Sequence, residues 1–289
     1  MRDRAVAIAN PASVLVSRDA AEPPMPGEER AAGPETSLWI GITLAAPAVL
    51  AAVFAPIAVP ADPFAAAGAP FMAPSLVHPF GTDDLGRDVL VEVTYGARTS
   101  LVAGVSVAAL ALALGLTVGA IAGFSRTWID DVLMRMTEFF QVVPRFFLAI
   151  LVLALFGNTL PNLVLVLALT SWGGLARIVR AEVLSLRERD FVRAARALGA
   201  RPPRILLYHI LPNAVQSLLP VGALVASSAI LTEAGMSYLG LGDPNLVSWG
   251  YLLNNAQRFL YQAWWMSLFP GLAIVITILG LGLILERFR

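Results

Sequence analysis

The stretch DFVRAARALG (residues 190–199), followed by LPN (residues 211–213), is a charged, arginine-rich segment between two long apolar segments. Two small residues, Ala194 and Ala195, lie between Arg193 and Arg196, and Gly199 follows. In a chain that crosses a membrane, such a segment lies in water on one side. The stretch therefore predicts a surface on which a soluble partner docks.

The composition indicates that lipid is the main solvent of this chain. Of its 289 residues, 57% are hydrophobic and 14% are charged, and the mean hydropathy is +0.74. A soluble domain carries about 25% charged residues. The formal net charge is zero, so no global charge attracts nucleic acid. The chain contains no cysteine, which excludes disulfides, thiolate nucleophiles and zinc–cysteine sites.

All 20 basic residues of the chain are arginine, because the sequence contains no lysine. A phosphate-binding loop of the GxxxxGK[ST] type needs its lysine at the β- and γ-phosphates. We therefore expect that the chain is not an enzyme and does not hydrolyse ATP by itself.

Long apolar windows predict an all-α polytopic membrane protein with six transmembrane helices. A spanning helix needs about 20 mostly apolar residues, and five windows qualify clearly: 36–61, 99–125, 160–176, 205–232 and 259–285. A sixth span over 133–156 is less clean, because it carries Arg135, Glu138 and Arg145. Prolines inside the windows are expected to kink the helices rather than end them; they are Pro47, Pro56, Pro220 and Pro270.

The placement of arginine predicts the orientation in the membrane. With six spans, both termini lie on one side, and that side holds most of the 20 arginines. Only Arg87, Arg98 and Arg258 fall on the other side. Because arginine accumulates on the cytoplasmic side, we expect cytoplasmic N and C termini. Residues 1–37 have no apolar core of a signal peptide and predict a disordered cytoplasmic tail.

The charged segment predicts a helix, a sharp turn and a second helix. Residues 186–198 read as a short helix, in which Ala194 and Ala195 permit close approach of another backbone. Gly199 suits the left-handed position after a helix, and prolines at 202–203 suit the first turn of the next one. Four arginines would surround this motif and meet carboxylates of a partner: Arg193, Arg196, Arg201 and Arg204. The alternative is a basic loop that only sets topology.

The spacing in this segment resembles the coupling loop of bacterial ABC importer permeases, written E-A-A, three residues, G, nine residues, I-x-L-P. The residues that fall at the spacing of the pattern are Ala194, Ala195, Gly199, Leu211 and Pro212. Two positions depart from it: Arg193 stands where glutamate is common, and His209 where isoleucine is common.

Three further stretches are similar to the dipeptide, oligopeptide and nickel importer permeases, the DppC/OppC branch. They are HPFGTDDLGRDVL (78–90) with YGARTSL (95–101), TEAGMSYLGLG (232–242) and SWG (248–250). The resemblance covers residues 38–285 and implies an ABC importer type I permease fold. It divides the chain into the tail (1–37), a first transmembrane helix (38–61), an external loop (62–98) and a permease core (99–289). The core holds five transmembrane helices and the cytoplasmic coupling loop (180–212).

The resemblance also implies the partners. They are a second homologous permease in a heterodimer, one or two cytoplasmic ABC ATPase subunits and an external solute-binding protein, all at the bacterial inner membrane. ATP and Mg²⁺ would be held by the ATPase subunits, with no cofactor or metal on this chain. The motion of the ATPase subunits would drive alternating access to peptides or similar small solutes. Dipeptides, oligopeptides, nickel chelates and glutathione remain open as cargo.

Four residues at the predicted outer side are candidates for an outer gate or a binding-protein contact: Glu233, Trp249, Asp83 and Arg87. Glu233 lies near the outer end of a span, where an ionisable residue is a functional candidate, with Arg98 or Arg258 as a partner. Trp249 belongs to an aromatic cluster that fits the headgroup level. Gly81 and Gly86 favour a structured turn around the acids of residues 83–88. Glycines at 115, 119 and 123 predict close helix packing.

Two other function classes stay open on sequence alone. An ion-coupled secondary transporter would work without partners, but carriers of that class often show internal repeats and acids near the midplane, which the sequence does not display. A membrane-embedded hydrolase needs a nucleophile within reach of a base. His209 has no evident serine motif beside it.

Overall fold

A computed structural model describes residues 34–125 and 127–286 of this chain, and these residues fold as a helical bundle. Most of the predicted tail, residues 1–33, lies outside the described residues. The helices are α1 (Pro34–Ala58), α2 (Val89–Ser125), α3 (Trp128–Val142), α4 (Arg145–Phe156), α5 (Leu160–Leu186), α6 (Asp190–Ala197), α7 (Pro202–Ile205), the π-helical turn η2 (Leu206–Ile210), α8 (Leu211–Tyr238), α9 (Trp249–Ala256) and α10 (Trp265–Glu286).

The predicted membrane spans are present as helices. Within the described part of the chain, five helical runs are long and apolar enough to cross a membrane, and α3 with α4 makes a sixth if the bent pair is one span. The prolines at 47, 56, 220 and 270 lie inside helices, as expected. α2 begins at Val89, so the last ten residues of the predicted external loop 62–98 are helical.

The sixth predicted span, 133–156, is not one helix. α3 and α4 are bent by 80° at a short break. Pro144 has no N–H for a helical hydrogen bond, and its ring disfavours a helical conformation for Val143. Val143 and Pro144 are accordingly extended, with ψ of 123° and 118°. The break places Arg145 at the first position of a new helix.

The predicted glycine stripe brings α2 and α5 into close contact. A Cβ atom at Gly115 would lie 2.6 Å from Cβ of Leu175, and one at Gly123 would lie 2.8 Å from the carbonyl oxygen of Arg180. Gly119 is equally crowded by Ala176 and Val179. Because only hydrogen fits in this space, the stripe fixes the distance between α2 and α5.

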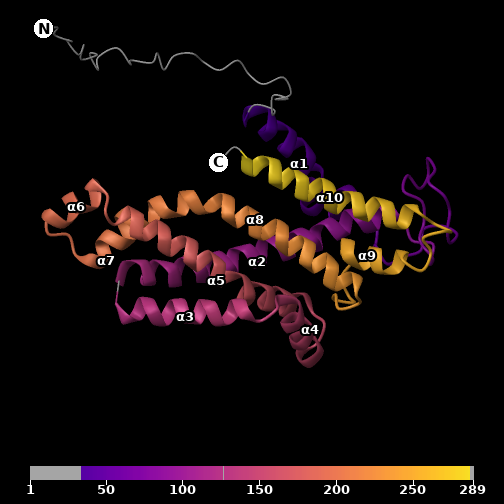
Figure 1. Cartoon of the computed structure of the whole chain (residues 1–289). Coiled ribbons are helices and arrows are strands. Elements are labelled where there is room, and N and C mark those ends of the chain that lie inside the picture. The colour runs from indigo at the N-terminus through magenta and orange to yellow at the C-terminus, as the bar shows by residue number, and fades with distance from the viewer. Residues whose placement is uncertain (1–33, 126, 287–289) are drawn as a thin grey trace, which may run out of the picture. The chain divides into compact units, whose positions relative to one another are not determined.

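α1 and α10 form a second close pair, and they lie side by side in Figure 1. A Cβ atom at Gly41 would lie 2.7 Å from the carbonyl oxygen of Gly280, and one at Gly280 would lie 2.7 Å from the backbone nitrogen of Ala45. Small residues on both helices again allow the backbones to touch.

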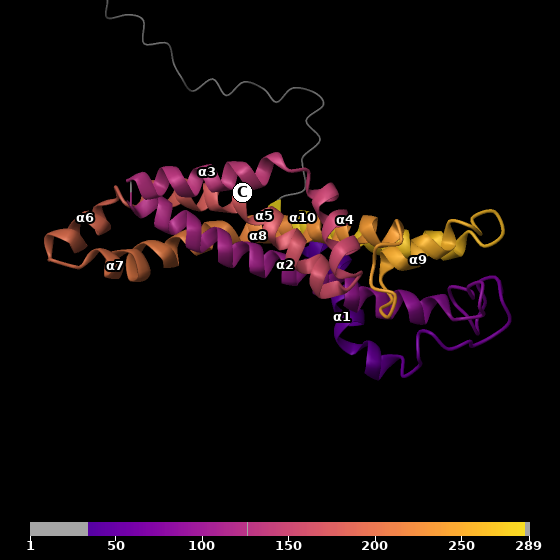
Figure 2. The ribbon, with the colours of Figure 1, turned by 90° about the horizontal axis from the view of Figure 1, so that it is seen from below.

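The bundle has two distinct ends. Both views place α6 and α7 at one end, and the loop before α2 together with α9 at the other (Figures 1 and 2). This separation agrees with the expectation that the charged segment and the external loop lie on opposite sides of the membrane.

A candidate coupling surface at one end of the bundle

α5 leads into α6 through a short turn, and α6 ends in a glycine cap. The N–H of Gly199 bonds to the carbonyl of Arg196 at 3.0 Å, and the N–H of Ala200 bonds to the carbonyl of Ala195 at 3.1 Å. This pair of bonds is the Schellman motif. It requires a left-handed residue after the helix, and Gly199 has φ of +81°. The predicted glycine stop is therefore confirmed, although the turn at 187–189 separates α6 from α5.

One side of α6 is packed onto the bundle. Val192 and Ala195 are buried in one hydrophobic cluster with Val179 and Val183 of α5, and this cluster also includes Ile205 and Ile210. Ala194 is exposed, so the two alanines do not present one shared surface. Ala195 holds α6 in place, while Ala194 faces outward.

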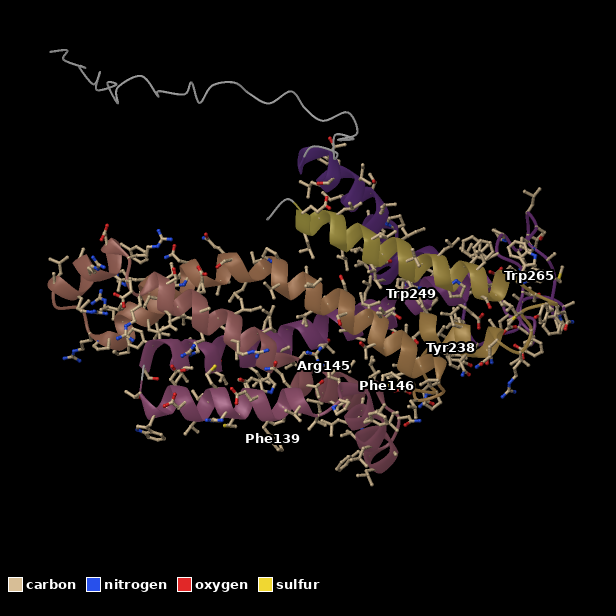
Figure 3. All side chains as sticks on the ribbon, viewed as in Figure 1. Phe139, Arg145, Phe146, Tyr238, Trp249 and Trp265 are labelled. Carbon is tan, nitrogen blue, oxygen red and sulfur yellow. The ribbon has the colours of Figure 1, made fainter. Side chains whose placement is uncertain are left out.

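The four predicted arginines form an exposed patch, which we call the arginine surface: Arg193, Arg196, Arg201 and Arg204. Figure 3 shows nitrogen-tipped side chains gathered around α6 and α7. Arg193 has a neighbour in Asp190 at 3.8 Å, but both side chains are largely exposed, so water screens the pair. The arginine surface is therefore free to meet carboxylates outside this chain.

The Leu211–Pro212 step widens the helix between α7 and α8. Pro212 cannot donate the N–H that a regular helix needs. The N–H of Leu211 instead reaches back five residues to the carbonyl of Leu206, and the side-chain amide of Asn213 donates to the carbonyl of His209 at 2.7 Å. At this point the structure has a π-helical turn, which keeps the helix continuous from α7 into α8.

Other arginines of the predicted coupling loop 180–212 and just before it bind the bundle itself. Arg180 donates from Nε and Nη2 to the two carboxylate oxygens of Asp130, each at 2.6 Å. Arg187 donates to the carbonyl of Phe124 at 2.6 Å, and Arg177 donates to Gln141. Asp130 precedes Arg180 by fifty positions, so no local sequence signal identified this bond. It ties α3 to α5 beside the arginine surface.

At the opposite end, Glu233 lies inside a hydrogen-bonded group and not beside Arg98 or Arg258. Its carboxylate accepts bonds from Ser100 at 2.9 Å and from Ser237 at 2.7 Å. Ser100 in turn accepts the N–H of Trp249 at 3.3 Å. The group joins α2, α8 and α9, and Glu233 is 1% exposed. A role in an outer gate stays a prediction.

Trp249 does not lie at the surface as the predicted aromatic belt requires. It is 1% exposed and donates from its indole nitrogen to the carbonyl of Val93 at 3.0 Å. Trp264 and Tyr261 are exposed, as a belt requires. Trp265 donates to the carbonyl of Thr82 at 3.0 Å and thereby fastens α10 to the loop before α2.

Asp83 and Arg87 organise that loop from within. Oδ1 of Asp83 accepts the N–H of Arg87 at 2.7 Å and of Leu85 at 2.8 Å. Burial raises the pKa of Asp83, while these two backbone bonds oppose the rise. Arg87 lies 3.8 Å from Glu92 and 4.0 Å from Asp83. The positive φ of Gly81 and Gly86 confirms the predicted turn, and Asp83 is buried rather than presented to a partner.

His78 completes the order in the loop. Its Nδ1 lies 2.8 Å from Oδ2 of Asp88, while Oδ1 of Asp88 accepts the N–H of Leu90 at the start of α2. This contact fixes His78 against the residue that caps the start of α2.

Comparisons with known proteins identify relatives along most of this chain. Residues 115–289 match the family described as binding-protein-dependent transport system inner membrane component. The chain is 36% identical to the dipeptide transport system permease protein DppC of Alkalihalophilus pseudofirmus, over 86% of this chain and 83% of the relative. It is 41% identical to a putative peptide transport system permease protein of Brucella suis, over 88% and 86%. It is 39% identical to the oligopeptide transport system permease protein OppC of Bacillus subtilis, over 75% and 71%.

Proposed function

Because the chain belongs to the family of binding-protein-dependent transport system inner membrane components, we propose that its α6–α7 segment couples a cytoplasmic ATPase to movement of the membrane-spanning helices. The chain is a multi-pass permease subunit of an ABC importer and not itself an ATPase. The energy for transport therefore comes from separate ATPase subunits. They hold ATP and Mg²⁺, which this chain does not bind.

The arginine surface is the observation that carries the proposal. Its four exposed guanidinium groups lie on a segment whose other side is buried in the bundle through Val192 and Ala195. Guanidinium groups pair with carboxylates in a fixed two-pronged geometry. An acidic groove on the ATPase subunit is the matching surface.

A displacement of the arginine surface is transmitted to the membrane-spanning helices α5 and α8. α7 continues through η2 into α8 without interruption, and the buried residues of α6 belong to one hydrophobic cluster with residues of α5 and α7. α5 is held to α2 by the glycine stripe and to α3 by Arg180. The ATPase pair must bind one arrangement of these helices more tightly than another, because otherwise ATP binding drives nothing.

We extend the proposal to partners and cargo on the strength of the relatives. The chain pairs with a second, homologous permease in the bacterial inner membrane, with its N and C termini and the arginine surface in the cytoplasm. An external solute-binding protein delivers cargo to the opposite end. Several relatives are named for dipeptide, oligopeptide or peptide transport, so peptides or similar small solutes are the proposed cargo.

Disulfide crosslinking tests the ATPase contact. The chain has no cysteine, so Ala194→Cys introduces a single thiol on the exposed face of α6. We expect this thiol to crosslink to cysteines placed along the acidic groove of the ATPase, and the crosslink to stop transport until it is reduced. Leu76→Cys is the matched control, because Leu76 is fully exposed at the other end of the bundle. Crosslinking of Leu76→Cys, or none at Ala194→Cys, contradicts the assignment.

Uptake by the chain alone separates this function from an ion-coupled transporter. The chain is reconstituted in liposomes without ATPase subunits, and an ion gradient is imposed. We expect no uptake until the ATPase subunits, the second permease and ATP are added. Gradient-driven uptake by the chain alone would overturn the proposal.

A further inference from the structure

The break between α3 and α4 opens onto a cavity of about 160 Å³. Arg145 contributes one wall at the start of α4, and helices α5 and α8 contribute the rest. The residues that line the cavity include Arg145, Ser171, Gly174, Val221, Val225 and Ser228. The proposed coupling role does not use this cavity.

The cavity lies at the middle of the membrane-spanning helices. Ser171 lies about eleven residues from the start of α5, and Gly174 about twelve from its end. Val221 and Ser228 lie about ten residues from the two ends of α8. At 1.5 Å per residue, each is about 15 Å from the nearer helix end, which is half the thickness of a bilayer core. In Figure 3, Arg145 is labelled near the middle of the bundle's long axis, so it does not lie at the cytoplasmic end where the placement of arginine predicts it.

Arg145 has no internal partner in the described part of the chain. Its side chain is exposed, and no ion pair or hydrogen bond joins it to another described residue. Arginine at the depth of the bilayer centre is costly, and such residues face water-filled paths and mark routes for substrates or ions. An unpaired arginine that borders a mid-membrane cavity therefore calls for an anion from outside the chain.

The walls of the cavity supply the hydrogen-bond donors and the apolar surface that a peptide site needs besides Arg145. The hydroxyl groups of Ser171 and Ser228 can donate hydrogen bonds, and Val221 and Val225 offer apolar surface. A Cβ atom at Gly174 would meet nothing within 4 Å, so this part of the wall faces open space. Guanidinium binds carboxylate with two parallel bonds. A small molecule with one carboxylate and an apolar body matches this lining.

We propose that this cavity is a cargo station in the translocation path, where Arg145 binds the C-terminal carboxylate of a peptide in transit. The proposal rests on the proposed function, because it takes a peptide-like solute as the cargo. It adds a specificity residue to this chain, distinct from any selection by the external binding protein.

A cysteine at position 174 tests whether the positive charge of Arg145 acts inside the cavity, and this test needs no cargo. Because the chain has no cysteine, Gly174→Cys carries the only thiol, and modification is followed by the mass of this chain within the assembled complex. The two probes are a negatively charged sulfonate and a positively charged trimethylammonium methanethiosulfonate. We expect Arg145→Gln to lower the sulfonate-to-trimethylammonium rate ratio by about tenfold, since a nearby positive charge is lost.

Arg135→Gln is the matched control for this experiment. Arg135 lies on α3 of the same broken span, but it is exposed and pairs with Glu138 at 3.8 Å, and it does not line the cavity. We expect no change in the rate ratio. An equal ratio in the parent, Arg145→Gln and Arg135→Gln proteins overturns the proposal.

Transport of matched peptides tests the cargo part. Alanine peptides of two to six residues are offered with a free C-terminal carboxylate or as the C-terminal amide, to the complete complex in proteoliposomes. Selection by the binding protein is common to all permease variants, so the acid-to-amide uptake ratio is compared between variants. We expect about a tenfold lower ratio in Arg145→Gln than in the parent, and recovery to within about threefold in Arg145→Lys.

The outcomes separate this inference from the proposed function. If the parent complex imports peptides with the same acid-to-amide ratio as Arg145→Gln, the carboxylate site is wrong while the permease assignment stands. If the parent imports none of the peptides but retains ATPase coupling, the peptide cargo fails, and the carboxylate assignment of Arg145 fails with it.

Discussion

Replacement of Gly199 by valine tests whether the geometry at the end of α6 transmits force. Gly199 has φ of +81° and no atom crowds its Cβ position, so any penalty comes from the backbone. Valine either keeps this conformation, at a cost of about 1–2 kcal/mol, or leaves it and loses two capping bonds, about 1–3 kcal/mol together. A shift of one to two kcal/mol changes a population by about 5- to 30-fold, so α6 keeps its capped conformation for a far smaller share of the time.

The assay is the number of cargo molecules imported per ATP hydrolysed in proteoliposomes. We expect Gly199→Val to keep membrane insertion and ATP hydrolysis but to lower this ratio at least about fivefold. Gly199→Asn should stay close to the parent, since asparagine tolerates the left-handed region.

Gly240→Val is the matched control. Gly240 follows α8 with φ of +82°, no atom lies near its Cβ position, and the same pair of capping bonds surrounds it. It lies at the other end of the bundle, so the same strain should leave the ratio of import to hydrolysis unchanged. An unaltered ratio in Gly199→Val, or an equal fall in both variants, would refute the coupling assignment.

The remaining predictions concern the supports of the coupling surface and the opposite loop. Ala195→Leu should overpack the buried side of α6 by about 1–3 kcal/mol, whereas Ala194→Leu should leave thermal stability unchanged and weaken only ATPase binding, as measured by thermal unfolding and co-purification. Asp130→Asn should lower the free energy of unfolding by about 1.5–3 kcal/mol, because the charged bond to Arg180 is lost. In a double-mutant cycle with Arg180→Gln, most of this loss should appear as coupling energy between the two residues. A coupling energy near zero would show that Asp130 acts only locally. Burial raises the pKa of Asp83, so its contribution to stability is greatest below the unfolded pKa and declines as pH rises through the folded one. The Tm of the parent relative to Asp83→Asn should accordingly fall as the pH rises above the ordinary aspartate pKa of 3.8, and a constant difference would exclude this cause.

Much of this architecture follows from local signals that can be read along the chain. Long apolar windows locate the spans, because a helix in lipid must satisfy its own backbone. Gly199 marks the end of α6, because the left-handed position after a helix disfavours side chains. The stripe at 115, 119 and 123 indicates a helix contact, because small side chains recur on one face.

The rest depends on contacts between distant segments. The mean hydropathy of a window of about 20 residues hardly changes at Val143 and Pro144, so the sequence predicted one span where the structure has α3 and α4. Ser237 lies one helical turn after Glu233, so that bond is local, but Ser100 lies 133 positions before Glu233 and no local pattern identifies it. Trp249 was expected at the headgroup level because tryptophan is common there, but its position on α9 turns it into the bundle.

The pairing of α1 with α10 sets an order for the assembly of the protein during its synthesis. Gly41 and Gly280 touch, although about 240 residues separate them, and α10 is the most extensive neighbour of α1. At roughly 5–20 residues per second, the ribosome takes on the order of 12–50 s to add that length. Throughout this time the first helix waits in the bilayer without its main partner. A chain that stops short of α10 keeps the contact of α1 with α2, but it leaves the small-residue face around Gly41 uncovered, and a complete copy covers this face.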